Sequence, residues 1–127
     1  MDWSQTIDAY CERTDASFWS EPLNAVTNLA FLITALVSWQ RVRGERLPLA
    51  GLLCALLAMI GIGSFLFHTF ATRWAALADT LPILAFILVY LFAANLHFLR
   101  VRWLFALIGM AVFIPFATLV TPVLAQV

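Results

Sequence analysis

Four long apolar runs, separated by short polar segments, make up most of the chain. They extend over about residues 23–40, 48–70, 77–99 and 103–123. None of them contains Lys or Arg, and Asp79 is the one acidic residue inside them. A helix of roughly 20 apolar residues crosses the hydrocarbon core of a bilayer, which is about 30 Å thick. The pattern therefore predicts an all-α integral membrane protein, a helical bundle of four transmembrane helices.

The first 22 residues differ from the rest of the chain. Five of the seven acidic residues lie within the first 21 positions, among aromatic side chains such as Trp3, Tyr10 and Trp19. This mixture indicates an ordered segment outside the membrane. We therefore expect an acidic extramembrane cap over residues 1–22 and a four-helix transmembrane domain over residues 23–127.

Composition agrees with a membrane protein and narrows the possible partners. Apolar residues make up 64% of the chain and charged residues 11%, whereas soluble domains have about 25% charged residues. The seven arginines and seven acids cancel, and no basic stripe is present, so nucleic-acid binding has no support. Two cysteines, Cys11 and Cys54, are too few for a disulfide framework.

The arginines predict how the helices are oriented. The first connection contains Arg41, Arg43 and Arg46, and the third contains Arg100 and Arg102, whereas the second, over residues 69–76, has one arginine. Cytoplasmic loops carry an excess of positive charge. We therefore expect the N-terminus to lie out of the cytoplasm, on the same side as the second connection. The short loops and the absence of lysine favour a prokaryotic inner membrane.

Three ionisable residues fall within or at the ends of the apolar runs, where a charge is costly and therefore indicates function. These are His68, Asp79 and His97. Ser64 and His68 are four residues apart and share a helix face. His68 is near the outer end of the second helix and Asp79 near the outer start of the third. Ser64, His68, Asp79 and the acidic cap are therefore expected to converge at one membrane face.

Each of these residues also has an ordinary explanation. A histidine near a helix end is often interfacial, a serine often packs between helices, and an aspartate at a helix start can cap it. His97 lies 18 residues after Asp79, about 27 Å along a helix, so it is expected to be interfacial. A serine hydrolase would need a histidine base on another helix at the depth of Ser64, and His97 is too distant.

Metal chemistry suits the predicted cluster better. A histidine beside a carboxylate and a hydroxyl is suited to holding a zinc-bound water. Catalytic zinc usually takes three protein ligands and one water. His68 is the one credible ligand that this sequence offers.

The same residues resemble a known family. Gly63-Ser64-x3-His68, followed eleven residues later by Asp79, is similar to the motif of the alkaline ceramidases, which belong to a superfamily of membrane hydrolases that includes the adiponectin receptors. Further similarity to that family's N-terminal segment and first helix lies in Tyr10-Cys11-Glu12, Trp19-Ser20-Glu21-Pro22-Leu23-Asn24 and Thr27-Asn28. The resemblance extends over about residues 8–82.

The resemblance implies a seven-helix zinc hydrolase that cleaves the amide bond of ceramide or a related lipid amide. It implies that His68 binds zinc and that Ser64 orients the water or stabilises the oxyanion. It also implies that Asp79 is the general base and acid.

The resemblance also implies a calcium site in the cap, for which acidic side chains are suitable ligands. Glu12 and Glu21 match two of its carboxylates. Asp8 stands one position from the residue that matches a family aspartate, and Tyr10 stands where the family has tryptophan. These four residues are the candidate calcium ligands.

Two further zinc histidines of the family lie in a His-x3-His arrangement on its last helix, which these 127 residues do not reach. We therefore expect the four helices to correspond to the first four of seven, and the chain alone to bind zinc weakly and hydrolyse little. Two alternatives remain open. One is a non-catalytic module that binds membrane lipid or a partner protein. The other is a small transporter in which Asp79 and His68 handle protons or ions.

Overall fold

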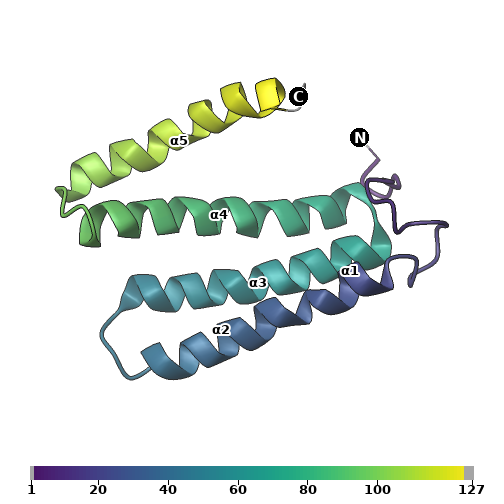
Figure 1. The fold of residues 1–127 in the computed structure, drawn as a ribbon, viewed down its shortest axis with the longest axis horizontal. Coiled ribbons are helices and arrows are strands. Elements are labelled where there is room, and N and C mark those ends of the chain that lie inside the picture. Colours follow the sequence, from purple (N-terminus) through teal and green to yellow (C-terminus); the bar gives the residue numbers. More distant parts are fainter. Residues whose placement is uncertain (1, 125–127) are drawn as a thin grey trace. The chain divides into compact units, whose positions relative to one another are not determined.

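The computed structural model describes residues 2–124, and its regular elements there are helices (Figure 1). The elements in chain order are α1 (Pro22–Thr27), α2 (Leu29–Val42), α3 (Pro48–Phe70), α4 (Arg73–His97) and α5 (Trp103–Leu124). Four helical spans in the described part are long and apolar enough to cross a membrane: Pro22–Val42, Pro48–Phe70, Arg73–His97 and Trp103–Thr121. The predicted all-α fold with four membrane helices is thus confirmed. Residues 1 and 125–127 of the two expected domains lie outside the described residues.

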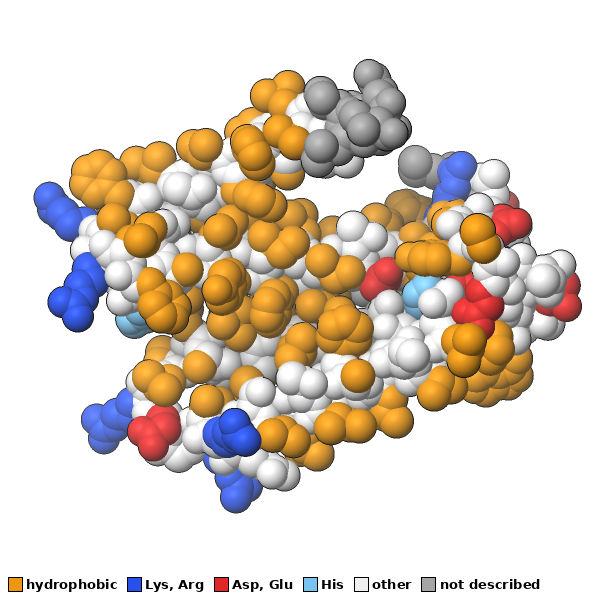
Figure 2. Space-filling view, viewed as in Figure 1, with side chains coloured by type: hydrophobic (Ala, Val, Ile, Leu, Met, Phe, Trp, Pro, Cys, Tyr) orange, Lys and Arg blue, Asp and Glu red, His pale blue; other side chains and the backbone are white. Residues whose placement is uncertain are grey.

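The chain divides into two compact units, Met1–Phe86 and Ile87–Val127. The first unit contains the cap, α1, α2, α3 and the first part of α4. All the candidate residues except His97 belong to it. Within this unit, acidic side chains gather at the cap and arginines at the opposite end, where α2 connects to α3 (Figure 2).

The first span is one stretch of helix with an interruption that the sequence pattern did not predict. A single helix over residues 23–40 was expected, but α1 ends at Thr27 and α2 begins at Leu29. The side-chain nitrogen of Asn28 donates to the carbonyl oxygen of Asn24 at 2.8 Å, and the Thr27 hydroxyl donates to that of Leu23 at 2.8 Å. Both bonds lie at the interruption, and side chains that bond to nearby backbone carbonyls compete with the helical pattern.

The second span matches its prediction, and the third begins earlier than expected. α3 covers Pro48–Phe70 and ends at Ala71, whose left-handed φ of 45° is typical of a residue that terminates a helix. The expected connection over residues 69–76 is wrong, because α4 already begins at Arg73. Asp79 therefore lies inside α4, beyond its first turn, and not at its start.

The cap is attached to this tight connection by backbone hydrogen bonds. The Ile7 N–H donates to the Ala71 carbonyl at 2.7 Å, and the Arg73 N–H donates to the Gln5 carbonyl at 3.1 Å. The first N–H groups of a helix have no partner within it. The Gln5 carbonyl supplies such a partner to α4. Together with the bond from Ile7 to Ala71, it fixes the N-terminal segment over the ends of α3 and α4.

A close approach between α3 and α4 sets the position of Asp79. Pro82 lies inside α4 and has no N–H, so the Ala78 carbonyl loses its helical donor. A Cβ added at Gly63 of α3 would overlap the oxygen of that carbonyl and would lie 3.1 Å from the Cα of Asp79. Glycine at this position lets the two backbones meet. The contact brings Asp79 beside Ser64, the next residue after Gly63.

The second unit contains the last part of α4 and all of α5. Arg100 has a φ of 53°, and the Val101 N–H donates to the Asn95 carbonyl at 3.2 Å where the chain turns toward α5. α5 begins at Trp103, as predicted, and ends at Leu124. Gly109 of α5 lies beside the Asn95 side chain.

Candidate functional site

His68 lies in the last turn of α3 and is buried against the cap. Its Nδ1 is 2.6 Å from Oε2 of Glu21, the residue that precedes α1. A carboxylate can only accept a hydrogen bond, so Nδ1 carries the hydrogen when Glu21 is ionised. The other ring nitrogen, Nε2, forms no hydrogen bond with residues 2–124. A histidine held in this way presents Nε2 as a potential metal ligand.

Glu21 is the most deeply buried acid of the cap. Its side chain is 2% exposed and is shared between His68 and Arg13. The Arg13 Nε donates to Oε1 of Glu21 at 2.5 Å, and one terminal guanidinium nitrogen donates to the His68 carbonyl oxygen at 3.1 Å. A buried carboxylate is tolerated when its oxygens are paired in this way.

The same contacts determine the charge of Glu21. Burial by itself raises the pKa of its carboxyl, but hydrogen bonds from His68 and Arg13, together with the guanidinium charge, lower the pKa below its ordinary value. Glu21 is therefore ionised at neutral pH and acts as a hydrogen-bond acceptor for both neighbours.

Ser64 and Asp79 lie beside His68 on its membrane side. Ser64 is buried one helical turn before His68, and both residues are near enough to the Asp79 carboxyl to interact with it. Oδ1 of Asp79 is buried and has no hydrogen-bond partner in the described part of the chain. Buried polar atoms are nearly always paired, so this one is available to a group that the structure does not contain.

The Tyr10 ring packs against the imidazole. The two ring centroids are 4.7 Å apart with planes at 63°, an edge-to-face arrangement. The sequence suggested Tyr10 as a calcium ligand and gave no sign of this contact, because 58 residues separate the two positions in the chain (68 − 10).

Glu12 has a structural contact of its own. Its two carboxylate oxygens accept hydrogen bonds from the backbone N–H groups of Leu23 and Asn24, at 2.8 and 3.0 Å. These are the first free N–H groups of α1, so Glu12 caps that helix from outside it. Asp8 is exposed at the surface of the cap.

The candidate calcium ligands are therefore not gathered around a common point with free oxygens. Glu12 uses both oxygens on α1, and Glu21 uses both on Arg13 and His68. Residues 2–124 contain no group of three or more His, Cys, Asp or Glu side chains close enough to share a metal ion. Calcium prefers about six to eight oxygen ligands, which these residues as placed do not provide.

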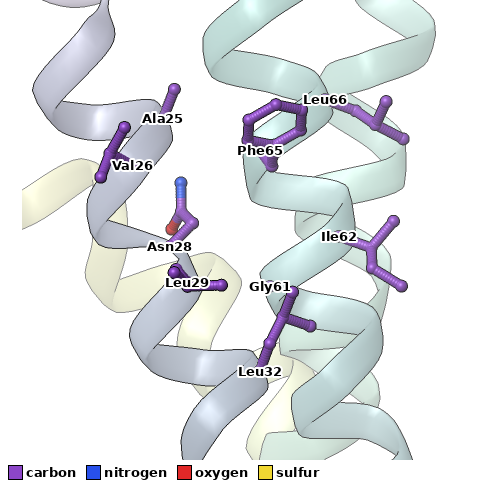
Figure 3. A pocket seen from close by; sticks show the side chains of 9 residues that line it. All are labelled: Ala25, Val26, Asn28, Leu29, Leu32, Gly61, Ile62, Phe65 and Leu66. Atoms are coloured by element: carbon purple, nitrogen blue, oxygen red, sulfur yellow. The ribbon is translucent and has the colours of Figure 1, made fainter.

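An apolar groove lies between the first span and α3, on the membrane side of the cap. Its volume is about 360 Å³, and side chains from both elements point toward it (Figure 3). It is lined by Ala25, Val26, Asn28, Leu29, Leu32, Gly61, Ile62, Phe65 and Leu66. Asn28 is its one polar lining residue, so the groove suits a hydrocarbon chain more than a polar ligand.

His97, the last residue of α4, belongs to the second unit and is not part of the cluster around His68. Its expected interfacial position stays a prediction.

Comparison with curated proteins and with solved structures finds no match to this chain. A family model described as Ceramidase matches residues 4–127, which is nearly the whole sequence. The match includes the cap with Arg13 and Glu21 as well as the helices that carry Ser64, His68 and Asp79. The chain therefore belongs to the ceramidase family and is an integral membrane protein with four helices able to span the bilayer.

Proposed function

We propose that this chain carries catalytic residues of a zinc-dependent membrane hydrolase that cleaves the amide bond of ceramide or a related lipid amide. The observation that carries the proposal is the cluster at the cap end of α3. There Glu21 holds Nδ1 of His68, and Ser64 and Asp79 lie beside the same ring. Membership of the ceramidase family supports a lipid substrate.

His68 is suited to be one zinc ligand. Zinc-binding histidines usually donate their second ring N–H to a carboxylate, which fixes the tautomer and the ring orientation. Glu21 has that position relative to His68. Catalytic zinc takes three protein ligands as a rule, so the proposal requires two ligands beyond His68. Zinc, when bound, supplies a Lewis acid for the amide carbonyl.

Asp79 and Ser64 are proposed to carry the remaining chemistry. Asp79 has an unpartnered buried oxygen, which would accept a proton from the attacking water and later return one to the leaving amine. The Ser64 hydroxyl would donate a hydrogen bond to the oxygen that becomes negatively charged in the transition state. Both side chains belong to helices that the Gly63 contact holds together, so their separation is set by backbone packing.

A lipid amide fits the surroundings of this cluster. The groove between the first span and α3 is apolar and lies within the helices that are able to span the membrane. A substrate that stays in the bilayer would place its hydrocarbon chain in such a groove and its amide toward the cap. The polar cluster then meets the one part of the lipid that can react.

The test has two readouts, zinc per chain by elemental analysis and hydrolysis of a fluorescent ceramide by the purified protein in lipid vesicles. We expect weak zinc binding and slow hydrolysis in the parent protein and in His97→Ala, and the loss of both in His68→Ala. His97→Ala is the matched control because it removes the only other histidine.

Equal zinc content in the two histidine variants would contradict the role of His68. Zinc bound through His68 without hydrolysis of any lipid amide would contradict the reaction. The second result would favour a non-catalytic lipid-binding module.

A further inference from the structure

The guanidinium of Arg13 is buried at the centre of the acidic cap, and neither the zinc site nor the hydrolytic chemistry explains it. Its side chain is 7% exposed. Each of its three nitrogens donates a hydrogen bond: Nε to Oε1 of Glu21 at 2.5 Å, and the terminal nitrogens to the carbonyl oxygens of His68 and Asp15 at 3.1 and 3.2 Å. Arg13 therefore connects the cap, the residue before α1 and the end of α3.

Arg13 lies among cap residues that the family resemblance suggested as calcium ligands. Glu12 and Glu21 are the two acids that match carboxylates of the calcium site implied by the family resemblance, but their oxygens are all engaged with protein donors. A calcium ion at Glu21 would have to displace Arg13, which remains charged in proteins, and would then be repelled by it. The residues present do not fit calcium.

We propose that Arg13 replaces a calcium ion in this cap and is the positioning residue that holds Glu21 against His68. The inference rests on the proposed function for the role of His68 as a zinc ligand. The guanidinium fork fixes one carboxylate oxygen of Glu21, so the other oxygen faces Nδ1. The same fork holds the backbone of His68, so the ring and its carboxylate partner are fixed by one side chain.

The geometry indicates what happens when the guanidinium is removed. Oε1 of Glu21 would lose its donor while the side chain is 2% exposed. An unpaired buried carboxylate oxygen is costly, so Glu21 would rotate toward water and release Nδ1. The imidazole would then sample both tautomers and several orientations.

The experiment observes this directly. The protein contains two histidines, so selective ¹⁵N and ¹³C labelling of histidine gives two sets of ring signals, with His97 as the internal reference. Spectra are recorded at constant pH on zinc-free protein in lipid nanodiscs, with calcium and with a calcium chelator. The variants are Arg13→Ala and, as the matched control, Arg46→Ala, which removes an exposed arginine at the other end of the first unit.

We expect the parent protein to give one His68 tautomer with hydrogen on Nδ1, identical with calcium and with chelator. Arg13→Ala is expected to lose this single-tautomer pattern while the His97 signals stay in place, and Arg46→Ala to change neither histidine. The proposal is overturned if chelation changes the parent His68 signals as Arg13→Ala does. It is also overturned if Arg13→Ala leaves them unchanged.

A second variant covers the case in which Arg13→Ala fails to fold, which displaced His97 signals would reveal. Arg13→Gln keeps hydrogen-bond donors and much of the volume but removes the charge. We expect the same loss of the single His68 tautomer, and an unchanged tautomer would overturn the proposal. Because the protein is free of zinc, these results do not depend on whether His68 binds zinc or whether the protein hydrolyses a lipid.

Discussion

At the scale of single residues, the acids of this protein have distinct uses that depend on their partners. Glu12 and Glu21 are both cap acids, yet one caps α1 and the other holds the His68 ring. Asp79 differs from both, because Oδ1 is buried without a partner among residues 2–124. An acid whose hydrogen-bonding capacity is already used serves structure, whereas one with an unused buried oxygen is available for chemistry.

This distinction predicts the effect of Asp79→Asn. The amide keeps the size of the side chain but cannot accept and return a proton, and general acid–base catalysis typically contributes about 10²–10⁴-fold to a rate. We expect ceramide hydrolysis to fall by about that factor while zinc content stays at the parent level. The measurements are initial rates in lipid vesicles and elemental analysis.

Glu45→Gln is the control for this prediction, because Glu45 is exposed in the connection between α2 and α3. Its rate should equal that of the parent. Hydrolysis by Asp79→Asn within about a factor of three of the parent rate would rule out the proton-transfer role.

Part of the candidate site could be predicted from the sequence. Ser64 and His68 share a helix face through their four-residue spacing, and Asp79 follows on the adjacent antiparallel helix at a similar depth. The contacts of Glu21 and Arg13 with His68 could not be predicted, because they join positions 47 and 55 residues apart. Without those contacts, the family resemblance implied one calcium site that includes both Glu12 and Glu21.

At the scale of elements, the cap determines how α1 begins. Pro22 is the first residue of this six-residue helix, and Glu21 at its N-cap makes no side-chain hydrogen bond to it. The two Glu12 oxygens instead accept the N–H groups of Leu23 and Asn24. A short helix depends strongly on such contacts, because few of its N–H groups have partners within it.

We therefore predict that Glu12→Ala destabilises the first unit by about 0.5–2 kcal/mol, the range found when helix caps are removed. Thermal unfolding in detergent, followed by circular dichroism, measures the change. Asp8→Ala is the matched control, since Asp8 is an exposed cap acid with no side-chain hydrogen bond in the described part of the chain. An equal loss of stability in both variants would contradict the capping role of Glu12.

The approach of α4 to α3 gives a second prediction about elements. A methyl group at Gly63 would overlap the Ala78 backbone carbonyl, which cannot rotate away as a side chain would. Overpacking of this kind typically costs about 1–3 kcal/mol. We expect Gly63→Ala to lower thermal stability by a corresponding amount and to lower hydrolysis further, because Asp79 moves with Ala78.

Gly44→Ala provides the comparison for Gly63→Ala, because an added Cβ at Gly44 meets no atom within 4 Å. It should unfold at the temperature of the parent. If Gly63→Ala is as stable and as active as Gly44→Ala, the close backbone contact does not set the position of Asp79.

The sequence predicted which helices exist better than it predicted the residues at which they begin and end. α3 extends from Pro48 to Phe70, as its apolar run predicted, and proline stands at the start of the helix. α4 begins at Arg73, before its apolar run, because a helix continues through polar residues once its first N–H groups are satisfied by the cap. Hydropathy therefore measures the length of a membrane span, whereas hydrogen bonding determines the length of the helix.

At the scale of the whole molecule, charge is distributed unevenly along the sequence. The cap contains five of the seven acids. Four of the seven arginines lie in the connections between α2 and α3 and between α4 and α5, and Arg41 lies in the last turn of α2. Positively charged connections favour the cytoplasmic side of a membrane. We propose that these two connections face the cytoplasm and that the cap, with the cluster around His68, faces out of it.

Cysteine labelling tests this orientation. Cys11 is exposed in the cap and Cys54 is buried in α3, so one thiol is available to a reagent that cannot cross membranes. We expect such a reagent to label the protein in spheroplasts of a bacterial host, and Cys11→Ser to abolish the labelling.

Glu45→Cys in the Cys11→Ser background places a thiol in the connection between α2 and α3. This thiol should react after permeabilisation and not before. Labelling of Glu45→Cys in sealed spheroplasts, together with no labelling of Cys11 in the parent protein, would place the cap in the cytoplasm. A ceramide would then meet Ser64, His68 and Asp79 from the inner leaflet of the membrane.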